Sequence, residues 1–158
     1  MAGKVKPIPD GYHSLTTYLS IKGAAAAIAF YKQAFGAEEL YRLPMPDGRV
    51  GHAELQIGDS RLMLADEMPE MPGAIAKSPR TLGGVSSGLN LYVGDVDAQF
   101  KRAVDAGATV KRPVTNQFYG DRSGTVEDPF GHVWTISTHV EDVSPEEIAR
   151  RMAALPHG

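Results

Sequence analysis

The sequence of 158 residues contains an internal repeat, which constrains the fold more than any other feature. Alternating apolar side chains predict a strand at 14–21, with Leu15 and Leu19 on its apolar face. Apolar side chains at helical spacing then predict a helix that ends at Gly36. The same pattern restarts near residue 86, and a shift of 72 positions places Leu19 on Leu91. We therefore expect two copies of one βαβββ unit.

Three further strands are predicted after the helix of each copy, at 38–44, 49–57 and 60–65 in the first and at 108–113, 122–127 and 133–138 in the second. The segment between the copies is rich in proline and glycine, which is typical of a mobile linker or of a lid over a site. A capping box at Ser144 predicts a short helix near the C-terminus. The predicted parts are an N-terminal extension (1–13), the first unit (14–65), the linker or lid (66–85), the second unit (86–140), and the C-terminal helix and tail (141–158).

The composition argues against several classes of protein. Its 16 Lys and Arg residues and 19 Asp and Glu residues give a net charge of −3, without the basic stripe that nucleic-acid-binding proteins carry. No apolar stretch approaches the roughly 18 residues of a membrane span, and the N-terminus lacks the apolar core of a secretory signal. Cysteine is absent, which excludes disulfides, a thiol nucleophile and cysteine-ligated zinc. We expect a cytoplasmic protein that binds neither nucleic acid nor membranes.

Three sequence segments occur in the order AIAFYKQAFGAEE, VGDVDAQFKRAVDAGATV and VEDPFGHVWTI. Together with the tandem βαβββ pattern, they resemble the vicinal oxygen chelate superfamily, which includes glyoxalase I, extradiol dioxygenases, fosfomycin-resistance enzymes and bleomycin-binding proteins. The segments DGRVGHAELQIGD and FYGDRSGTVEDPFGH are most similar to its PhnB-like branch. The resemblance covers residues 14–140. It implies an α+β fold in which two curled mixed sheets enclose a cup, as in the glyoxalase/bleomycin-resistance/dihydroxybiphenyl-dioxygenase fold, and a homodimer.

The metal site of the superfamily is not expected in this chain. The resemblance places its four ligands at Thr16, at one residue from Leu62 to Leu64, at Gly88 and at Thr135. None of these is a histidine or a carboxylate, which a divalent ion of this class needs. We therefore predict no metal and no other cofactor.

His52 and Glu54 are the strongest candidates for chemistry in the sequence. They alternate with the apolar Ala53 and Leu55, so both side chains point away from the apolar face of the strand at 49–57. If the sheet curls, this face is the inside of the cup. The pair then contacts a ligand, acts as an acid–base pair, or forms structural hydrogen bonds. Metal ligation by the pair is the least favoured reading.

The other histidines carry weaker signals. His13 is expected on the surface, His132 in a structural hydrogen bond and His157 in the terminal segment. His139 follows Thr135 by four residues and is expected at the rim of the cup.

The remaining cup positions are neutral hydroxyls, amides and phenols, with further candidates in the loop 118–124. Arg122 in this loop is expected either to clamp a carboxylate or phosphate or, as the favoured reading, to pair with Asp121 or Glu127. Trp134 is expected in the core. The predicted ligand-binding residues are Thr16, Tyr18, Asn90, Tyr92, Tyr119, Arg122, Thr135 and His139.

These patterns favour a protein that binds a small organic molecule in a metal-free cup. One alternative is a non-metal lyase or isomerase that uses His52 and Glu54, with Tyr119, as acid–base groups. A second is a metal-dependent glyoxalase-type or dioxygenase-type enzyme, which the missing ligands disfavour. A purely structural role ranks last. Nucleophilic catalysis has no support, because the sequence contains neither a GxSxG segment nor cysteine.

Overall fold

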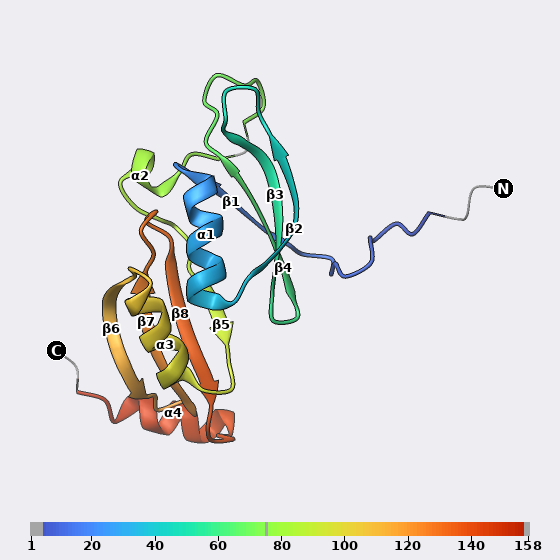
Figure 1. The fold of residues 1–158 in the computed structure, drawn as a ribbon. Coiled ribbons are helices and arrows are strands. Elements are labelled where there is room, and N and C mark those ends of the chain that lie inside the picture. The colour runs from blue at the N-terminus through green and yellow to red at the C-terminus, as the bar shows by residue number, and fades with distance from the viewer. Residues whose placement is uncertain (1–4, 75, 157–158) are drawn as a thin grey trace. The chain divides into compact units, whose positions relative to one another are not determined.

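The computed structural model describes residues 5–74 and 76–156. The chain forms two compact units, Met1–Gly84 (unit 1) and Val85–Gly158 (unit 2). Each unit contains one four-stranded mixed sheet, and neither sheet closes into a barrel (Figure 1). The α+β prediction with two βαβββ units is therefore confirmed. In the described part of the chain, no helix is long and apolar enough to cross a membrane.

Unit 1 begins with β1 (Thr17–Ile21) and α1 (Ala24–Phe35), followed by β2 (Glu38–Pro44), β3 (Val50–Ile57) and β4 (Ser60–Asp66). The strand order is β1-β4-β3-β2, with β1 and β4 parallel and the other pairs antiparallel. Alternate residues of the strands face α1 and form the core of the unit with its apolar side. The fully buried side chains of this core include Ile21, Ile28, Tyr31, Leu55 and Leu64.

Unit 2 repeats this arrangement with β5 (Leu89–Tyr92), α3 (Val96–Asp105), β6 (Thr109–Asn116), β7 (Asp121–Glu127) and β8 (Val133–His139). The strand order is β5-β8-β7-β6. Tyr18 pairs with Met63 across β1 and β4, and Asn90 pairs with Thr135 across β5 and β8. Both members of the second pair lie 72 positions after those of the first. The strand pairing therefore repeats with the same shift of 72 positions that the sequence shows.

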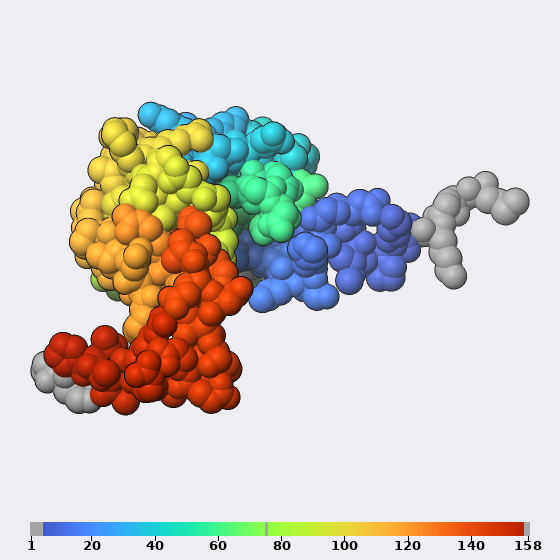
Figure 2. Space-filling view, turned by 90° about the horizontal axis from the view of Figure 1, so that it is seen from below, coloured from blue at the N-terminus to red at the C-terminus, as the bar shows by residue number. Residues whose placement is uncertain are grey.

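The final helix, α4 (Pro145–Ala153), buries none of its residues. It begins as predicted, because the Ser144 hydroxyl accepts a hydrogen bond from the backbone of Glu147 at 3.3 Å. Figure 2 shows the C-terminal segment standing out from the body of unit 2. Arg151 ties the helix to this body by donating to the carbonyl oxygen of Phe118.

The two units cap their helices differently. The residue before α1 is Gly23, which has no capping side chain. The Asp66 carboxylate at the end of β4 replaces the cap and accepts hydrogen bonds from the backbone of Gly23, Ala24 and Val50. In unit 2, Asp95 caps α3 itself, and the Thr138 hydroxyl accepts from the backbone of Val96.

Two details differ from the sequence-based expectation. Leu15 was placed on the apolar face of the first strand, but it is 90% exposed, because the pairing of β1 with β4 begins only at Thr17. The segment between the units contains a short helix, α2 (Pro79–Leu82), that was not predicted. Trp134 is buried as predicted, and its Nε1 donates to the buried Asp128 carboxylate at 3.0 Å.

Candidate functional site

Each sheet has one face packed against its helix and an opposite face, which we call the open face. Because paired residues of neighbouring strands share a face, the register identifies its members. In unit 1, the open face carries polar and polarizable side chains from all four strands. They include Tyr18, Ser20, Tyr41, His52, Glu54, Gln56, Arg61 and Met63.

A hydrogen-bonded chain of three side chains lies on this face. The Tyr18 hydroxyl meets His52 Nδ1 at 3.0 Å, and His52 Nε2 meets the Glu54 carboxylate at 3.2 Å. An ionised carboxylate only accepts, so Nε2–H donates to Glu54 and Nδ1 is left to accept from the phenol. The predicted partners His52 and Glu54 are thus in contact, and Tyr18 extends them into a phenol–imidazole–carboxylate chain.

Tyr12 of the N-terminal segment lies beside this chain. Arg61 lies over its ring, 5.5 Å from the ring centroid, and Arg61 Nε donates to the carbonyl oxygen of Gly11. Among the described residues, none forms a hydrogen bond of standard geometry with the buried Tyr12 hydroxyl. The hydroxyl nevertheless lies close enough to the Glu54 carboxylate for each group to shift the pKa of the other. Burial and then the Glu54 carboxylate raise the pKa of Tyr12 to about 12. The Tyr12 hydroxyl, followed by His52, lowers the pKa of Glu54 and keeps it ionised at neutral pH.

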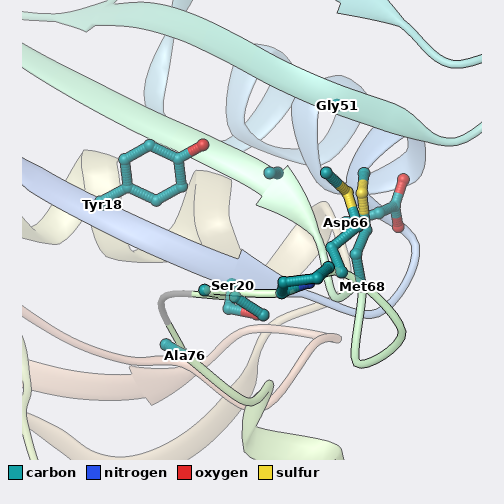
Figure 3. Close-up of a pocket in the computed structure, with 11 residues that line it drawn as sticks. Tyr18, Ser20, Gly51, Asp66, Met68 and Ala76 are labelled. Atoms are coloured by element: carbon teal, nitrogen blue, oxygen red, sulfur yellow. The ribbon is translucent and has the colours of Figure 1, made fainter.

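A pocket of about 190 Å³ opens at the other end of the same face. Tyr18 and Ser20 of β1 and Gly51 of β3 form its sheet side (Figure 3). Its other side is the loop after β4, which contributes the two methionines Met68 and Met71. The remaining lining residues are Ala65, Asp66, Pro72, Gly73, Ala74 and Ala76.

The loop over the pocket is held by polar contacts at both of its ends. Near its start, Glu70 forms an ion pair with Arg49. Near its end, the hydroxyls of Ser78 and Thr81 both donate to the Glu67 carboxylate, at 2.7 and 2.6 Å. Met68 is buried between these anchors. The pocket therefore has one wall from the sheet and one from an anchored loop.

The open face of unit 2 has a different chemistry. Its register aligns Asn90, Thr135, Thr125 and Arg112 in one row across all four strands. The Thr125 and Thr135 hydroxyls are 3.2 Å apart, and Arg112 Nη2 donates to Thr125 and to the buried Ser123. The row therefore consists of hydroxyls and an amide with a guanidinium at one end.

A second network lies at the end of this face. Asp121 accepts from the Tyr92 hydroxyl at 2.7 Å and lies 2.9 Å from His139 Nδ1, while His139 Nε2 lies 2.9 Å from Asp142. Asp142 and then Asp121 raise the pKa of His139, and Asp121 also raises the pKa of Tyr92. His139 is half exposed.

The side chains at the four positions that the resemblance implies for metal ligands do not suit a metal ion. Leu62 and Leu64 are buried, so the open-face residue of that strand is Met63, which the register matches to Thr135. A thioether, two threonines and a glycine are not ligands for a divalent ion of the expected class. Within residues 5–74 and 76–156, no group of three or more His, Asp or Glu side chains is arranged to hold a metal ion.

The other predicted site residues are dispersed. Arg122 was expected to pair with Asp121 or Glu127, but it lies on the α3 side of β7 and forms a bidentate ion pair with Asp97. Thr16 precedes β1, and Tyr119 is exposed in a loop against Phe118. His13 is exposed and His132 is buried, whereas His157 lies outside the described residues.

The structure adds residues that sequence reasoning missed. They are Tyr12, Arg61, Arg112, Met68 and Met71. Tyr12 and the two methionines lie outside the repeated pattern, so strand alternation gave no signal for them. In β4, Arg61 alternates with the buried Leu62. This alternation was the one sequence signal that placed Arg61 on the open face.

Comparison with known proteins gives concordant results. Residues 13–136 match the family description "Glyoxalase/Bleomycin resistance protein/Dioxygenase superfamily". An uncharacterized protein of Mycobacterium tuberculosis, Rv0887c, is 44% identical over 145 residues, which covers 92% of this chain and 85% of that protein.

Solved structures agree at the level of the fold. The antibiotic binding protein TnmS3 from Streptomyces sp. CB03234 superposes with a TM-score of 0.59 at 26% identity, covering 81% of this chain and 96% of that one. A PhnB protein from Bacillus cereus, described as a putative 3-demethylubiquinone-9 3-methyltransferase, gives a TM-score of 0.60 at 18% identity, with 80% and 99% covered.

Proposed function

The chain belongs to the Glyoxalase/Bleomycin resistance protein/Dioxygenase superfamily, and we propose that it binds a small organic molecule in the pocket of unit 1 without using a metal. The observation that carries this proposal is the pocket itself, formed between Tyr18 and Ser20 on the sheet and Met68 and Met71 on the loop. The antibiotic-binding neighbour TnmS3 supports the same class of function.

The lining of the pocket indicates the kind of group that it accepts. Met68, Met71 and Pro72 provide an apolar wall, and methionine adapts well to flat, polarizable surfaces. Tyr18 and Ser20 supply hydroxyls on the opposite wall. An apolar cavity of about 150 Å³ is large enough for benzene, so an open pocket of about 190 Å³ accepts a small aromatic group of one or two rings. We infer a ligand with a planar apolar group and a hydrogen-bonding substituent.

A fluorescence titration with 2-naphthol tests this proposal. We expect a Kd of about 0.1–1 mM, as ligand efficiencies allow for so small a probe. Tyr18→Phe removes the hydroxyl and should weaken binding about three- to tenfold, the usual range for one neutral hydrogen bond. Tyr41→Phe is the matched control, because Tyr41 lies on the same open face but is not among the residues that line the pocket.

The loop wall is tested in the same assay. Met71 is 47% exposed, so Met71→Ala should weaken 2-naphthol binding while the melting temperature stays within a few degrees. Met152→Ala removes an exposed methionine from α4 and serves as the control. Binding that neither Tyr18→Phe nor Met71→Ala changes would place the ligand elsewhere and contradict the proposal.

Acid–base catalysis without a metal is the second candidate, and the Tyr18–His52–Glu54 chain favours it. Burial raises the pKa of Tyr18, so its phenol is protonated at neutral pH and donates to His52 Nδ1. In the proposed step, the Tyr18 oxygen accepts the α-proton of a ketone while its own proton passes to His52 Nδ1, and the Glu54 carboxylate stabilises the imidazolium that forms. The enolate then takes up a deuteron that has exchanged from the solvent, and the chain returns to its starting state. This candidate predicts exchange of the α-protons of cyclohexanone for deuterium, with loss of that exchange in His52→Gln. Pure binding predicts no exchange above the buffer rate.

The proposal also includes the oligomeric state, the location, the branch of the superfamily and the loop function that the sequence predicted. We propose a homodimer in the cytoplasm, a position in the PhnB-like branch, and a role as lid for the loop within 66–85. The position of Met68 and Met71 in the wall of the pocket supports the last of these.

A further inference from the structure

Arg112 on the open face of unit 2 carries a positive charge with only neutral partners. Its Nη2 donates to the hydroxyl oxygens of Ser123 at 3.1 Å and Thr125 at 3.4 Å. In the described part of the chain, no carboxylate forms an ion pair with it. The contrast is with five arginines that each pair with a carboxylate, namely Arg42, Arg49, Arg122, Arg150 and Arg151.

The backbone fixes the side of the sheet on which Arg112 lies. Arg112 pairs with Thr125 across β6 and β7. Gly124, next to Thr125, lies against Phe100 of α3, so Thr125 and Ser123 point to the opposite, open face. Ser123 is fully buried beneath the guanidinium. Arg112 therefore lies over a floor of neutral hydroxyls rather than in contact with the helix.

The guanidinium keeps donors available for a ligand. Its hydrogen bonds within the described residues use Nη2 alone, which leaves the N–H donors of Nε and Nη1. A hydrogen bond from such a donor to a carboxylate or phosphate oxygen is charge-assisted and therefore stronger than a neutral one. The hydroxyls of Ser123 and Thr125 orient the group without neutralising its charge.

Two carboxylates of β7, the strand that Arg112 contacts, are already engaged. Glu127 of β7 forms an ion pair with Lys111 at 2.9 Å. Asp121 is bonded to Tyr92 and His139. An external anion therefore meets an uncompensated positive charge at Arg112.

From this arrangement we propose that Arg112 binds the carboxylate or phosphoryl group of a small molecule on the open face of unit 2. Thr125, Thr135 and Asn90, aligned with it in one row, provide further hydrogen bonds to the same ligand. The proposal uses none of the residues that line the pocket of unit 1, so the two proposals are tested by different variants.

Titrations with benzoate and with inorganic phosphate at low ionic strength test the site. The readouts are calorimetry and the NMR signal of the Arg112 Nε–H. We expect at least one anion to bind the wild-type protein and to shift this signal, and the neutral isostere benzamide to leave it unchanged. Which anion shifts the signal distinguishes a carboxylate ligand from a phosphoryl ligand.

Three variants test whether the charge of Arg112 is responsible for anion binding. Arg112→Gln should weaken anion binding about tenfold or more, and Arg112→Lys less, because lysine keeps the charge but loses the fixed N–H donors of the guanidinium. Lys101→Gln is the control, since Lys101 is an exposed cation of α3 in the same unit, and it should bind as the wild type does. Melting curves confirm that each variant is folded.

Three results would overturn the proposal. The first is that neither anion binds the wild-type protein. The second is that Arg112→Gln binds as tightly as the wild type. The third is that Lys101→Gln loses as much affinity as Arg112→Gln, because the anion would then respond only to net charge.

Discussion

The two units share one backbone register but present different chemistry on their open faces. The row Tyr41, Glu54, Met63 and Tyr18 of unit 1 corresponds strand by strand to the row Arg112, Thr125, Thr135 and Asn90 of unit 2. The faces that contact the helices bury apolar side chains in both units, such as Leu55 and Leu64 in unit 1 and Val126 and Ile136 in unit 2. The fold therefore depends on the buried face, and the open face is where the two copies differ in side-chain chemistry.

The charged member of the row is a carboxylate in unit 1 and a guanidinium in unit 2. In unit 1, the ionised Glu54 is bonded to His52, with Tyr12 and Arg61 beside it. In unit 2, the corresponding row holds the guanidinium of Arg112 over hydroxyls. A polar donor chain beside an apolar pocket suits a neutral aromatic ligand, whereas the second row suits an anion.

The largest expected effect is on the free energy of unfolding, when the equivalent residues Asp66 and Thr138 are replaced. Asp66→Ala removes three hydrogen bonds to a carboxylate and leaves the first turn of α1 without a cap. We expect it to lower the free energy of unfolding by about 3 kcal/mol. Thr138→Ala should cost about 1 kcal/mol, because α3 keeps the Asp95 cap. Urea unfolding followed by far-UV circular dichroism measures both values.

The same two variants can also contradict the proposed difference in helix capping between the units. Losses of equal size would mean that Asp66 does not replace the missing cap of α1. A loss in Thr138→Ala larger than in Asp66→Ala would contradict the assignment of the two caps altogether. The fluorescence of Trp134, the single tryptophan of the chain, reports on unit 2 separately.

A smaller effect distinguishes the units by pH. The lowered pKa of Glu54 adds stability that is present above its ordinary value of 4.5 and is lost as the pH falls through the lowered pKa. The raised pKa of His139 adds stability that is present below 6.5 and is lost as the pH rises through the raised pKa. Both effects should be smaller than the capping effects, because these groups are partly exposed.

Unfolding free energies measured across pH in Glu54→Gln and His139→Gln separate these two contributions. Glu54→Gln should flatten the acid side of the stability profile, and His139→Gln should flatten the side above pH 6.5. A variant with the wild-type slope on its own side would show that its titration is not linked to folding.

Much of the fold and part of the site follow from local sequence pattern. Alternation along β3 correctly placed His52 and Glu54 on one face, because that strand has a regular period of two where it pairs with β4. The contact with Tyr18 joins residues 34 positions apart, and the sequence supplied both side chains but not their hydrogen bond.

The errors also have physical causes. Arg122 was read as part of a loop, but β7 begins at Asp121, so the next residue points to the helix side. Arg112 was not singled out, because register shifts on both sides of it break the alternation that would reveal its face. The pocket wall around Met68 comes from a segment without a repeating pattern, whose path depends on the contacts of Glu67 and Glu70.

The most direct test of the central claim is the affinity for 2-naphthol of protein treated with EDTA, measured before and after addition of Zn²⁺, Ni²⁺, Mn²⁺ or Fe²⁺. Metal-free binding predicts the same Kd under every condition and no rise in melting temperature with any of the ions. A stoichiometric metal that raises the melting temperature and is required for binding would contradict the account. It would also identify His52 and Glu54 as candidate metal ligands.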